Sequence, residues 1–128
     1  MNIRKNFSSG AKWEDIVGYS RAVLIGNQLE ISGTVATDES GTVGKGDVYA
    51  QTEFIIRKME KVLEQAGFGL GDVIRTRVFV TDISKWEDVG RAHGKFFKDI
   101  KPATSMIEVS ALIDPDYLVE IEMTAVKG

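Results

Sequence analysis

Residues 47–80 read DVYAQTEFIIRKMEKVLEQAGFGLGDVIRTRVFV and contain two patterns that guide the interpretation of the whole chain. In the first, apolar side chains recur every three or four residues and form one stripe: Val48, Ile55, Ile56, Met59, Val62, Leu63 and Ala66, with Thr52 among them. Polar side chains cover most of the opposite face: Gln51, Glu53, Arg57, Lys58, Glu60, Lys61 and Glu64. Because Asp47 is a typical N-cap and Gly67 a typical residue after a helix end, we expect an amphipathic helix over residues 48–66.

The second pattern is an alternation over residues 73–80. Successive side chains of a strand point to opposite faces of the sheet. One face receives Ile74, Thr76, Val78 and Val80, and the other receives Arg75, Arg77 and Phe79. This alternation predicts a strand with an apolar face toward the helix and a mixed face away from it.

The remaining elements lie on both sides of this segment. Upstream, residues 22–26 and 29–33 read as a β-hairpin around Asn27-Gln28, and the glycine-rich residues 34–46 read as a loop. Downstream, we expect a helix over 86–98 after the N-cap Ser84, and strands over 104–109 and 118–126 around a turn at 114–116. The predicted order is β-β-α-β-α-β-β, with room for a short N-terminal strand, in an α+β fold that forms one domain over residues 1–128.

Two helices can cover only one face of such a sheet. The other face should carry an aromatic side chain mixed with opposite charges: Arg75, Arg77, Phe79, Glu120 and Glu122. Arg–Glu pairing across strands could neutralise these charges, but the mixture is not ordinary solvent surface. We therefore expect this face to pack against another subunit.

Composition narrows the chemistry. The 128 residues are 43% hydrophobic and 27% charged, as in folded globular proteins, and contain neither a membrane-length apolar run nor a signal-peptide core, so we expect a cytoplasmic protein with no membrane partner. No cysteine and one histidine exclude thiolate catalysis and two-histidine metal sites, and we expect no metal. The net charge of −3 argues against a nucleic-acid partner. Carboxylates, hydroxyls, arginine, lysine or backbone groups must carry any reaction.

Five segments carry a family resemblance. They are GYSRAV at 18–23; ISGTV at 31–35 with DESG at 38–41; GDVYAQT at 46–52; LEQAG at 63–67 with DVI at 72–74 and VFVTD at 78–82; and PATSMIEV at 102–109 with LVEIE at 118–122. Together they span nearly the whole chain, in order and with matching spacing. In this pattern the sequence resembles the RidA (YjgF) family of small trimeric proteins.

This resemblance implies a chorismate-mutase-like α+β subunit and a homotrimer, in which three sheets form a barrel-like core with the helices outside. It also implies small-metabolite pockets in the clefts between adjacent subunits. Many family members hydrolyse reactive 2-imino or enamino acids, formed by pyridoxal-phosphate enzymes, to 2-keto acids and ammonia. They need no cofactor and no metal.

Two positions depart from the deaminating members of that family. Those members grip the substrate carboxylate with an arginine, whose guanidinium offers a bidentate fork, and the matching position here is Thr104. They also use an asparagine on the second helix, and the matching position here is Gly90. The expectation of standard 2-imino acid deaminase activity is weakened by both departures.

A partial site remains. Glu120 matches the family glutamate that orients or activates water, and Tyr19 matches the tyrosine near the pocket. Burial in a cleft would move the pKa of Glu120 toward neutrality and suit it to acid–base work. The alternatives are a structural Glu120 paired with Arg75 or Arg77, and a Tyr19 that serves only packing.

Five further residues are candidates for the ligand site. Thr104 and Ser105 offer hydroxyls or simply form the strand, and backbone groups of Ser105 or Ile107 could contact a ligand carbonyl. His93 either packs as a replacement for the aromatic residue usual in the family, or builds a different pocket together with the space left at Gly90.

Three functions stay open from the sequence. The first is hydrolysis or tautomerisation of a small imine, enamine or keto compound, with altered specificity. The second is non-catalytic binding of a small metabolite in the same cleft. The third is ribonuclease or translation-inhibitor activity, which has been described for some family members but which the acidic chain and the absence of a basic patch disfavour.

Overall fold

The computed structural model describes residues 3–128. The helices are α1 (Lys12–Val17), α2 (Val48–Gln65) and α3 (Trp86–Phe97), with short 3-10 turns at Leu70–Asp72 and Ile83–Lys85. The strands are β1 (Arg4–Phe7), β2 (Ala22–Ile25), β3 (Gln28–Val35), β4 (Thr37–Asp38), β5 (Gly41–Thr42), β6 (Val73–Val80), β7 (Ala103–Glu108) and β8 (Val119–Val126). Within residues 3–128, no helix is both long and apolar enough to cross a membrane.

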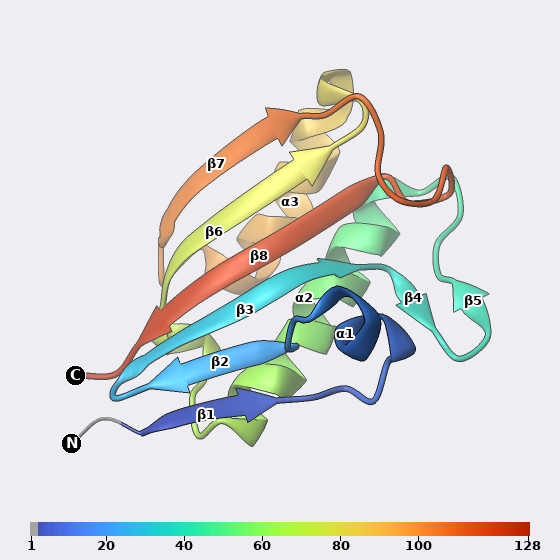
Figure 1. Ribbon diagram of the computed structural model, residues 1–128. Helices are drawn as coiled ribbons and strands as arrows, with labels where there is room; N and C mark the ends of the chain where they lie inside the picture. Colours follow the sequence, from blue (N-terminus) through green and yellow to red (C-terminus); the bar gives the residue numbers. More distant parts are fainter. Residues whose placement is uncertain (1–2) are drawn as a thin grey trace.

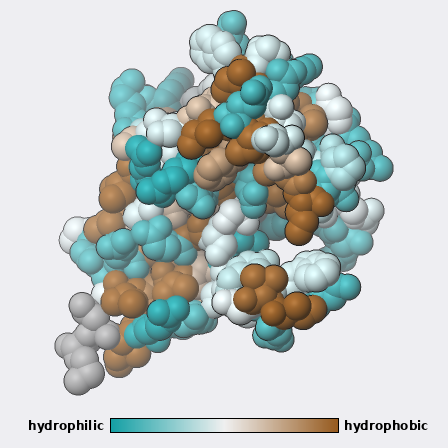
Figure 2. Space-filling view, turned by 45° about the horizontal axis from the view of Figure 1, so that its top comes forward, coloured by the Kyte–Doolittle hydropathy of each residue, from teal (hydrophilic) through white to brown (hydrophobic). Residues whose placement is uncertain are grey.

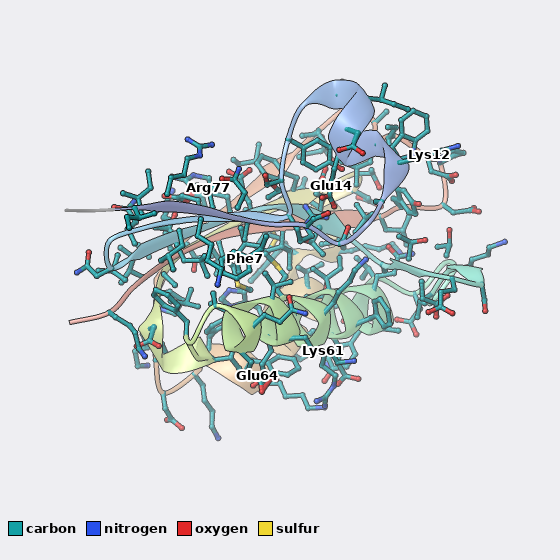
Figure 3. The ribbon with its side chains drawn as sticks, turned by 60° about the horizontal axis from the view of Figure 1, so that its bottom comes forward. Phe7, Lys12, Glu14, Lys61, Glu64 and Arg77 are labelled. Carbon is teal, nitrogen blue, oxygen red and sulfur yellow. The ribbon has the colours of Figure 1, made fainter. Side chains whose placement is uncertain are left out.

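Six strands form one mixed sheet in the order β1-β2-β3-β8-β6-β7. All neighbours are antiparallel except β6 and β7, which run parallel because α3 connects them as a crossover. Helices α2 and α3 lie together behind the sheet in Figure 1, whereas α1 lies on the opposite side, as Figure 3 shows. The α+β prediction with two long helices on one face is therefore confirmed.

The core lies between the sheet and α2. Asp47 caps α2 by accepting a hydrogen bond from the backbone N–H of Ala50 at 3.0 Å, and Gly67 follows the helix with a φ of +83°. The predicted apolar stripe is buried, and Ile55, Ile56, Met59 and Leu63 have no exposed surface. The polar face was predicted wrongly at Gln51, which is fully buried and bonds to backbone groups of Gly44, Asp116 and Leu118.

The alternation on β6 holds from Arg75 onward. Thr76, Val78 and Val80 are buried toward the helices, and Arg77 lies on the other side of the sheet, as labelled in Figure 3. The prediction for Ile74 was wrong, because Ile74 is 51% exposed while Val73 is 3% exposed. The register between β6 and β8 shifts between Val73 and Arg75, and this bulge exchanges the faces of the two residues.

The N-terminal part holds the short strand for which the predicted order left room, β1, and further elements that the pattern did not predict. Strand β1 pairs with β2 at the sheet edge, and β4 and β5 form a small separate hairpin within the predicted loop. Helix α1 has only six residues, with Ala11 as an N-cap that offers no side-chain hydrogen bond. It ends at Gly18, whose left-handed φ of 88° favours glycine. This helix lies on the side of the sheet opposite α2 and α3 (Figure 3), and its side chains Trp13, Ile16 and Val17 are exposed.

Candidate functional site

A cleft of about 1100 Å³ lies between the N-terminal segment, the end of β3 and helix α2. Figure 2 shows the surface hollowed between a small lobe and the body of the molecule. The wall residues come from four segments, 9–21, 33–39, α2 and 113–120: Ser9, Gly10, Ala11, Trp13, Val17, Tyr19, Arg21, Gly33, Val35, Thr37, Asp38, Glu39, Phe54, Arg57, Lys58, Lys61, Ile113, Tyr117 and Glu120. The cleft thus combines aromatic and aliphatic walls with both signs of charge.

Glu120 enters this cleft from β8, where it lies opposite Val35 of β3 and Phe79 of β6. It is half-buried, and burial raises the pKa of its carboxyl group. Arg21 partly opposes this rise and Glu122 adds to it, so that the pKa ends above its ordinary value of 4.5. A raised pKa makes this carboxylate a stronger proton acceptor than a solvated one.

Gly33 makes room for that carboxylate. The pairing of β3 with β8 shifts register between Ile31 and Thr34, and the Gly33 backbone comes up against the Glu120 side chain. A Cβ atom at position 33 would clash with the Oε2 atom of Glu120. The glycine in the ISGTV segment is therefore part of the site through its missing side chain.

Four cations line the same cleft, Arg21, Arg57, Lys58 and Lys61, and backbone carbonyls hold two of them. The Nη2 of Arg21 donates a hydrogen bond to the backbone carbonyl of Gly33 at 2.6 Å, and the Nζ of Lys58 donates to the carbonyl of Thr37 at 3.0 Å. Burial lowers the pKa of Lys58, and the neighbouring Arg21 charge lowers it further, while Asp38 opposes the change. Sequence reasoning missed both residues, because Lys58 was placed on the exposed helix face and Arg21 carried no motif of its own.

The N-terminal wall of the cleft is held by Glu14, which is 5% exposed. Its carboxylate accepts hydrogen bonds from the backbone N–H and the hydroxyl of Ser9. Burial raises the pKa of Glu14, but the hydrogen bonds from Ser9 and Ser8 outweigh this effect and lower it. The Glu14 carbonyl accepts the N–H groups of Gly18 and Tyr19, each at 2.9 Å, which fixes the start of the segment that carries the tyrosine.

Tyr19 and Glu120 are therefore brought together, since both line this cleft. The Tyr19 ring is 38% exposed, and the guanidinium carbon of Arg21 lies 5.9 Å from its centroid. Within residues 3–128, Glu120 forms an ion pair with neither Arg75 nor Arg77, which were the partners of the alternative structural interpretation. Instead, Arg77 pairs with Glu122 at 3.7 Å and Arg75 donates to the hydroxyl of Ser105 at 2.8 Å.

Thr104, His93 and Gly90 lie elsewhere, at the β7 edge of the sheet on the side of α3. The hydroxyls of Thr104 and Thr76 are 2.8 Å apart, and Thr76 is 2.9 Å from the Nε2 of His93. Thr104 donates its hydroxyl proton to the Pro102 carbonyl, at 3.1 Å, so its oxygen is free to accept from Thr76. Thr76 in turn accepts from His93 when the neutral ring carries its proton on Nε2. Burial lowers the pKa of His93 and so favours the neutral ring.

Sequence reasoning missed Thr76, the fully buried link in this chain. His93 also packs its ring against Phe97, with centroids 4.7 Å apart. A Cβ atom at Gly90 would meet nothing within 4 Å, so this position leaves open space beside the helix.

Ser105 and Ile107 occupy a third place, on the open face of the sheet. Ser105 lies opposite Arg77, and Ile107, which is 43% exposed, lies opposite Phe79. Because Phe79 in turn lies opposite Glu120, Ile107 is in the same row of the sheet as the carboxylate but two strands away. A single subunit therefore does not gather all the predicted site residues into one cleft.

Comparison with known proteins agrees with this geometry. The sequence model of the family described as Endoribonuclease L-PSP matches residues 10–127. An uncharacterized protein of Streptomyces coelicolor is 34% identical over 124 residues, covering 97% of this chain and 92% of that protein. The human 2-iminobutanoate/2-iminopropanoate deaminase is 32% identical over 122 residues, covering 94% of this chain and 88% of the enzyme.

Solved structures show the same fold. A Mycobacterium tuberculosis protein of the YjgF/YER057c/UK114 family is 47% identical, with a TM-score of 0.88 over 98% of this chain and 100% of that one. A putative endoribonuclease of Thermotoga maritima is 31% identical, with a TM-score of 0.82 over 97% of this chain and 93% of that one. The chain therefore belongs to the RidA/YjgF family, whose sequence model is named for endoribonuclease L-PSP.

Proposed function

We propose that the protein hydrolyses a small imine or enamine to a carbonyl compound and ammonia in the cleft at Glu120. The observation that carries this proposal is a half-buried carboxyl group with a raised pKa in the wall of a cleft that Tyr19 also lines. The human relative, a 2-iminobutanoate/2-iminopropanoate deaminase, supports the reaction class.

The reaction needs one proton acceptor and one proton donor in turn. Glu120 as carboxylate accepts a proton from water while the hydroxyl oxygen bonds to the imine carbon. The protonated Glu120 returns this proton to nitrogen and gives a carbinolamine. The carboxylate then takes the proton of the carbinolamine hydroxyl and passes it to the nitrogen, so that the carbon–nitrogen bond breaks, ammonia leaves and the carbonyl forms. We assign to the hydroxyl of Tyr19, which lines the same cleft, the donation of a hydrogen bond to the substrate.

The proposed active unit is a homotrimer with the site between adjacent subunits. The open sheet face supports it, because Phe79 is only half-buried and Ile107 is 43% exposed beside the charged pair Arg77–Glu122. Ser105 and Ile107 lie on this face, apart from the Glu120 cleft of their own subunit. A neighbouring copy could bring these residues to Glu120, which one chain alone does not do.

The alternative is a protein that binds a metabolite without converting it. Thr104 favours this function, because the position that carries the carboxylate-binding arginine in deaminating relatives here bears an uncharged hydroxyl. That hydroxyl is engaged by Thr76 and by the Pro102 carbonyl.

The test generates imines in place with an amino-acid oxidase and monitors release of the keto acid. We expect the wild-type protein to accelerate release and Glu120→Gln to remove the acceleration, with Lys98→Met as a control at an exposed position outside the cleft. If no imine is hydrolysed faster, but keto acids raise the Tm of the protein, the binding alternative replaces the enzymatic one.

A further inference from the structure

We propose that Arg21 and Lys58 bind the carboxylate of the molecule that occupies the Glu120 cleft, so that this anion-binding role has moved away from position 104. The proposal rests on the proposed function insofar as the cleft is taken to receive a small molecule. It assigns the substrate class, a small monocarboxylate with an apolar side chain, and the residues that select it.

The first argument is that neither cation forms an ion pair within the described residues. The ion pairs found among residues 3–128 join Lys45 to Asp116, Arg77 to Glu122, Arg91 to Asp88 and Lys95 to Glu53. Arg21 and Lys58 are in none of them, and each has only a backbone carbonyl, of Gly33 or Thr37, as hydrogen-bond acceptor. Since a guanidinium carries five N–H groups and an ammonium three, both retain donors for a ligand.

The second argument is electrostatic. Arg21 and Lys58 are both partly buried and near enough for the charge of Arg21 to disfavour protonation of Lys58. Two like charges held together away from full solvation are costly unless an anion lies between or beside them. Asp38 and Glu120 offset part of this cost. The cleft wall nevertheless holds four cations, Arg21, Arg57, Lys58 and Lys61, against three carboxylates, Asp38, Glu39 and Glu120, whereas the whole chain carries a net charge of −3.

The third argument is position. Arg21 bonds to Gly33, and Gly33 is the residue against which the Glu120 carboxylate packs. Lys58 reaches the same end of the cleft from α2 and bonds to Thr37, shortly beyond the end of β3. A carboxylate held there would place its neighbouring carbon on the side of Glu120, as hydrolysis of a 2-imino acid requires.

The remaining walls indicate which kind of side chain the bound carboxylate carries. Trp13, Val17, Phe54 and Ile113 line the cleft and offer apolar surface. An aliphatic side chain of a small keto or imino acid would be removed from water against them. A monocarboxylate with an aliphatic side chain therefore fits the Arg21–Lys58 pair and these apolar walls together.

The test measures equilibrium binding, without turnover, of 2-oxobutanoate and of its uncharged methyl ester. We expect the wild-type protein to bind the acid more tightly than the ester. We expect Arg21→Met and Lys58→Met each to weaken binding of the acid about tenfold, as loss of a charged hydrogen bond does, and to leave binding of the ester nearly unchanged. Lys98→Met makes the same change of charge outside the cleft and should not alter either affinity.

Because Arg21 also bonds to the Gly33 carbonyl, Arg21→Lys provides a second variant that retains the charge, and Lys58→Arg does the same on α2. Both should keep the preference for the acid. The proposal is overturned if the folded wild-type protein does not bind the acid or does not prefer it, or if the methionine variants bind the acid as the wild type does. If the protein hydrolyses an imine but the Arg21→Met and Lys58→Met variants bind the acid with wild-type affinity, only the present proposal is overturned. If the protein binds the acid selectively but hydrolyses no imine, only the proposed reaction is overturned.

Discussion

Replacing Gly33 by alanine should displace the Glu120 side chain without unfolding the protein. The new Cβ would clash with the Oε2 atom of Glu120, the outer end of a flexible side chain, and its nearest contacts are all atoms of that same side chain. The backbone of Gly33 is not in the left-handed region, so alanine can adopt it. The carboxylate must therefore move, while the strands need not.

The cost to stability is the cost of displacing one side chain from its preferred rotamer. That is about 1 kcal/mol, which corresponds to a decrease in Tm of about 3–5 °C for a chain of this size. The cost to catalysis is larger, because moving a reacting group by about 1 Å lowers the rate about a hundredfold. Gly33→Ala should thus remain folded and lose most of its activity.

The assay combines thermal unfolding with kcat/KM for imine hydrolysis. Gly71→Ala is the matched control, because a Cβ atom there meets nothing within 4 Å and Gly71 lies in the 3-10 turn before β6, outside the cleft. A folded Gly33→Ala protein with wild-type kcat/KM would contradict the assignment of Glu120 as the reacting carboxyl group. A protein that fails to fold would show that the backbone, and not the Glu120 side chain, meets the new methyl group.

Four further predictions concern ionisation and assembly. Glu120→Gln should raise the Tm at pH 7. The raised pKa of Glu120 in the folded protein contributes stability that is fully present below the ordinary pKa of 4.5 and is lost as the pH rises through the folded pKa, so that the charged carboxylate is unfavourable at pH 7. The increase in Tm should therefore vanish in thermal unfolding recorded near pH 4. His93→Gln should remove a pH dependence in the opposite direction. The lowered pKa of His93 contributes stability that is present above pH 6.5 and is lost as the pH falls through the folded pKa. The free energy of unfolding in urea should therefore lose this contribution below pH 6.5 in the wild type but not in the variant. Thr76→Val, which leaves the Nε2 of His93 without its partner, should cost about 1–2 kcal/mol in the same measurement, and an unchanged unfolding free energy would contradict the hydrogen-bond chain. Phe79→Glu on the open sheet face should dissociate the proposed trimer in sedimentation velocity, whereas Trp86→Glu, at an exposed aromatic residue that begins α3, should not. A wild-type monomer at micromolar concentration would contradict the proposed assembly.

Where local signals were strong, the fold could be predicted from the sequence. The helix expected over 48–66 is α2 at Val48–Gln65, because Asp47 and Gly67 define its ends through local backbone chemistry. The face of Ile74 could not be predicted, since the bulge depends on the pairing of β6 with β8, a strand far along the chain. Helix α1 was missed because six residues are too few for a periodic pattern.

The site was predictable only in part. Glu120 and Tyr19 came from the family resemblance and do lie in one cleft. Arg21 could not be recognised, because its role depends on a carbonyl twelve residues away that β3 brings back beside it. Gln51 was misplaced because its amide is satisfied by a segment at the other end of the chain, and helical spacing does not report such contacts.

The way Glu14 holds the N-terminal segment gives the cleft two walls of different character. Strands β3 and β8 form one wall, and the cooperative sheet fixes it. The other wall, with Trp13 and Val17, is held by the hydrogen bonds between the Glu14 carboxylate and Ser9. Substitutions in residues 8–18 can therefore reshape the pocket without disturbing the strands. In this architecture, substrate range can diverge between relatives while the scaffold that presents Glu120 stays the same.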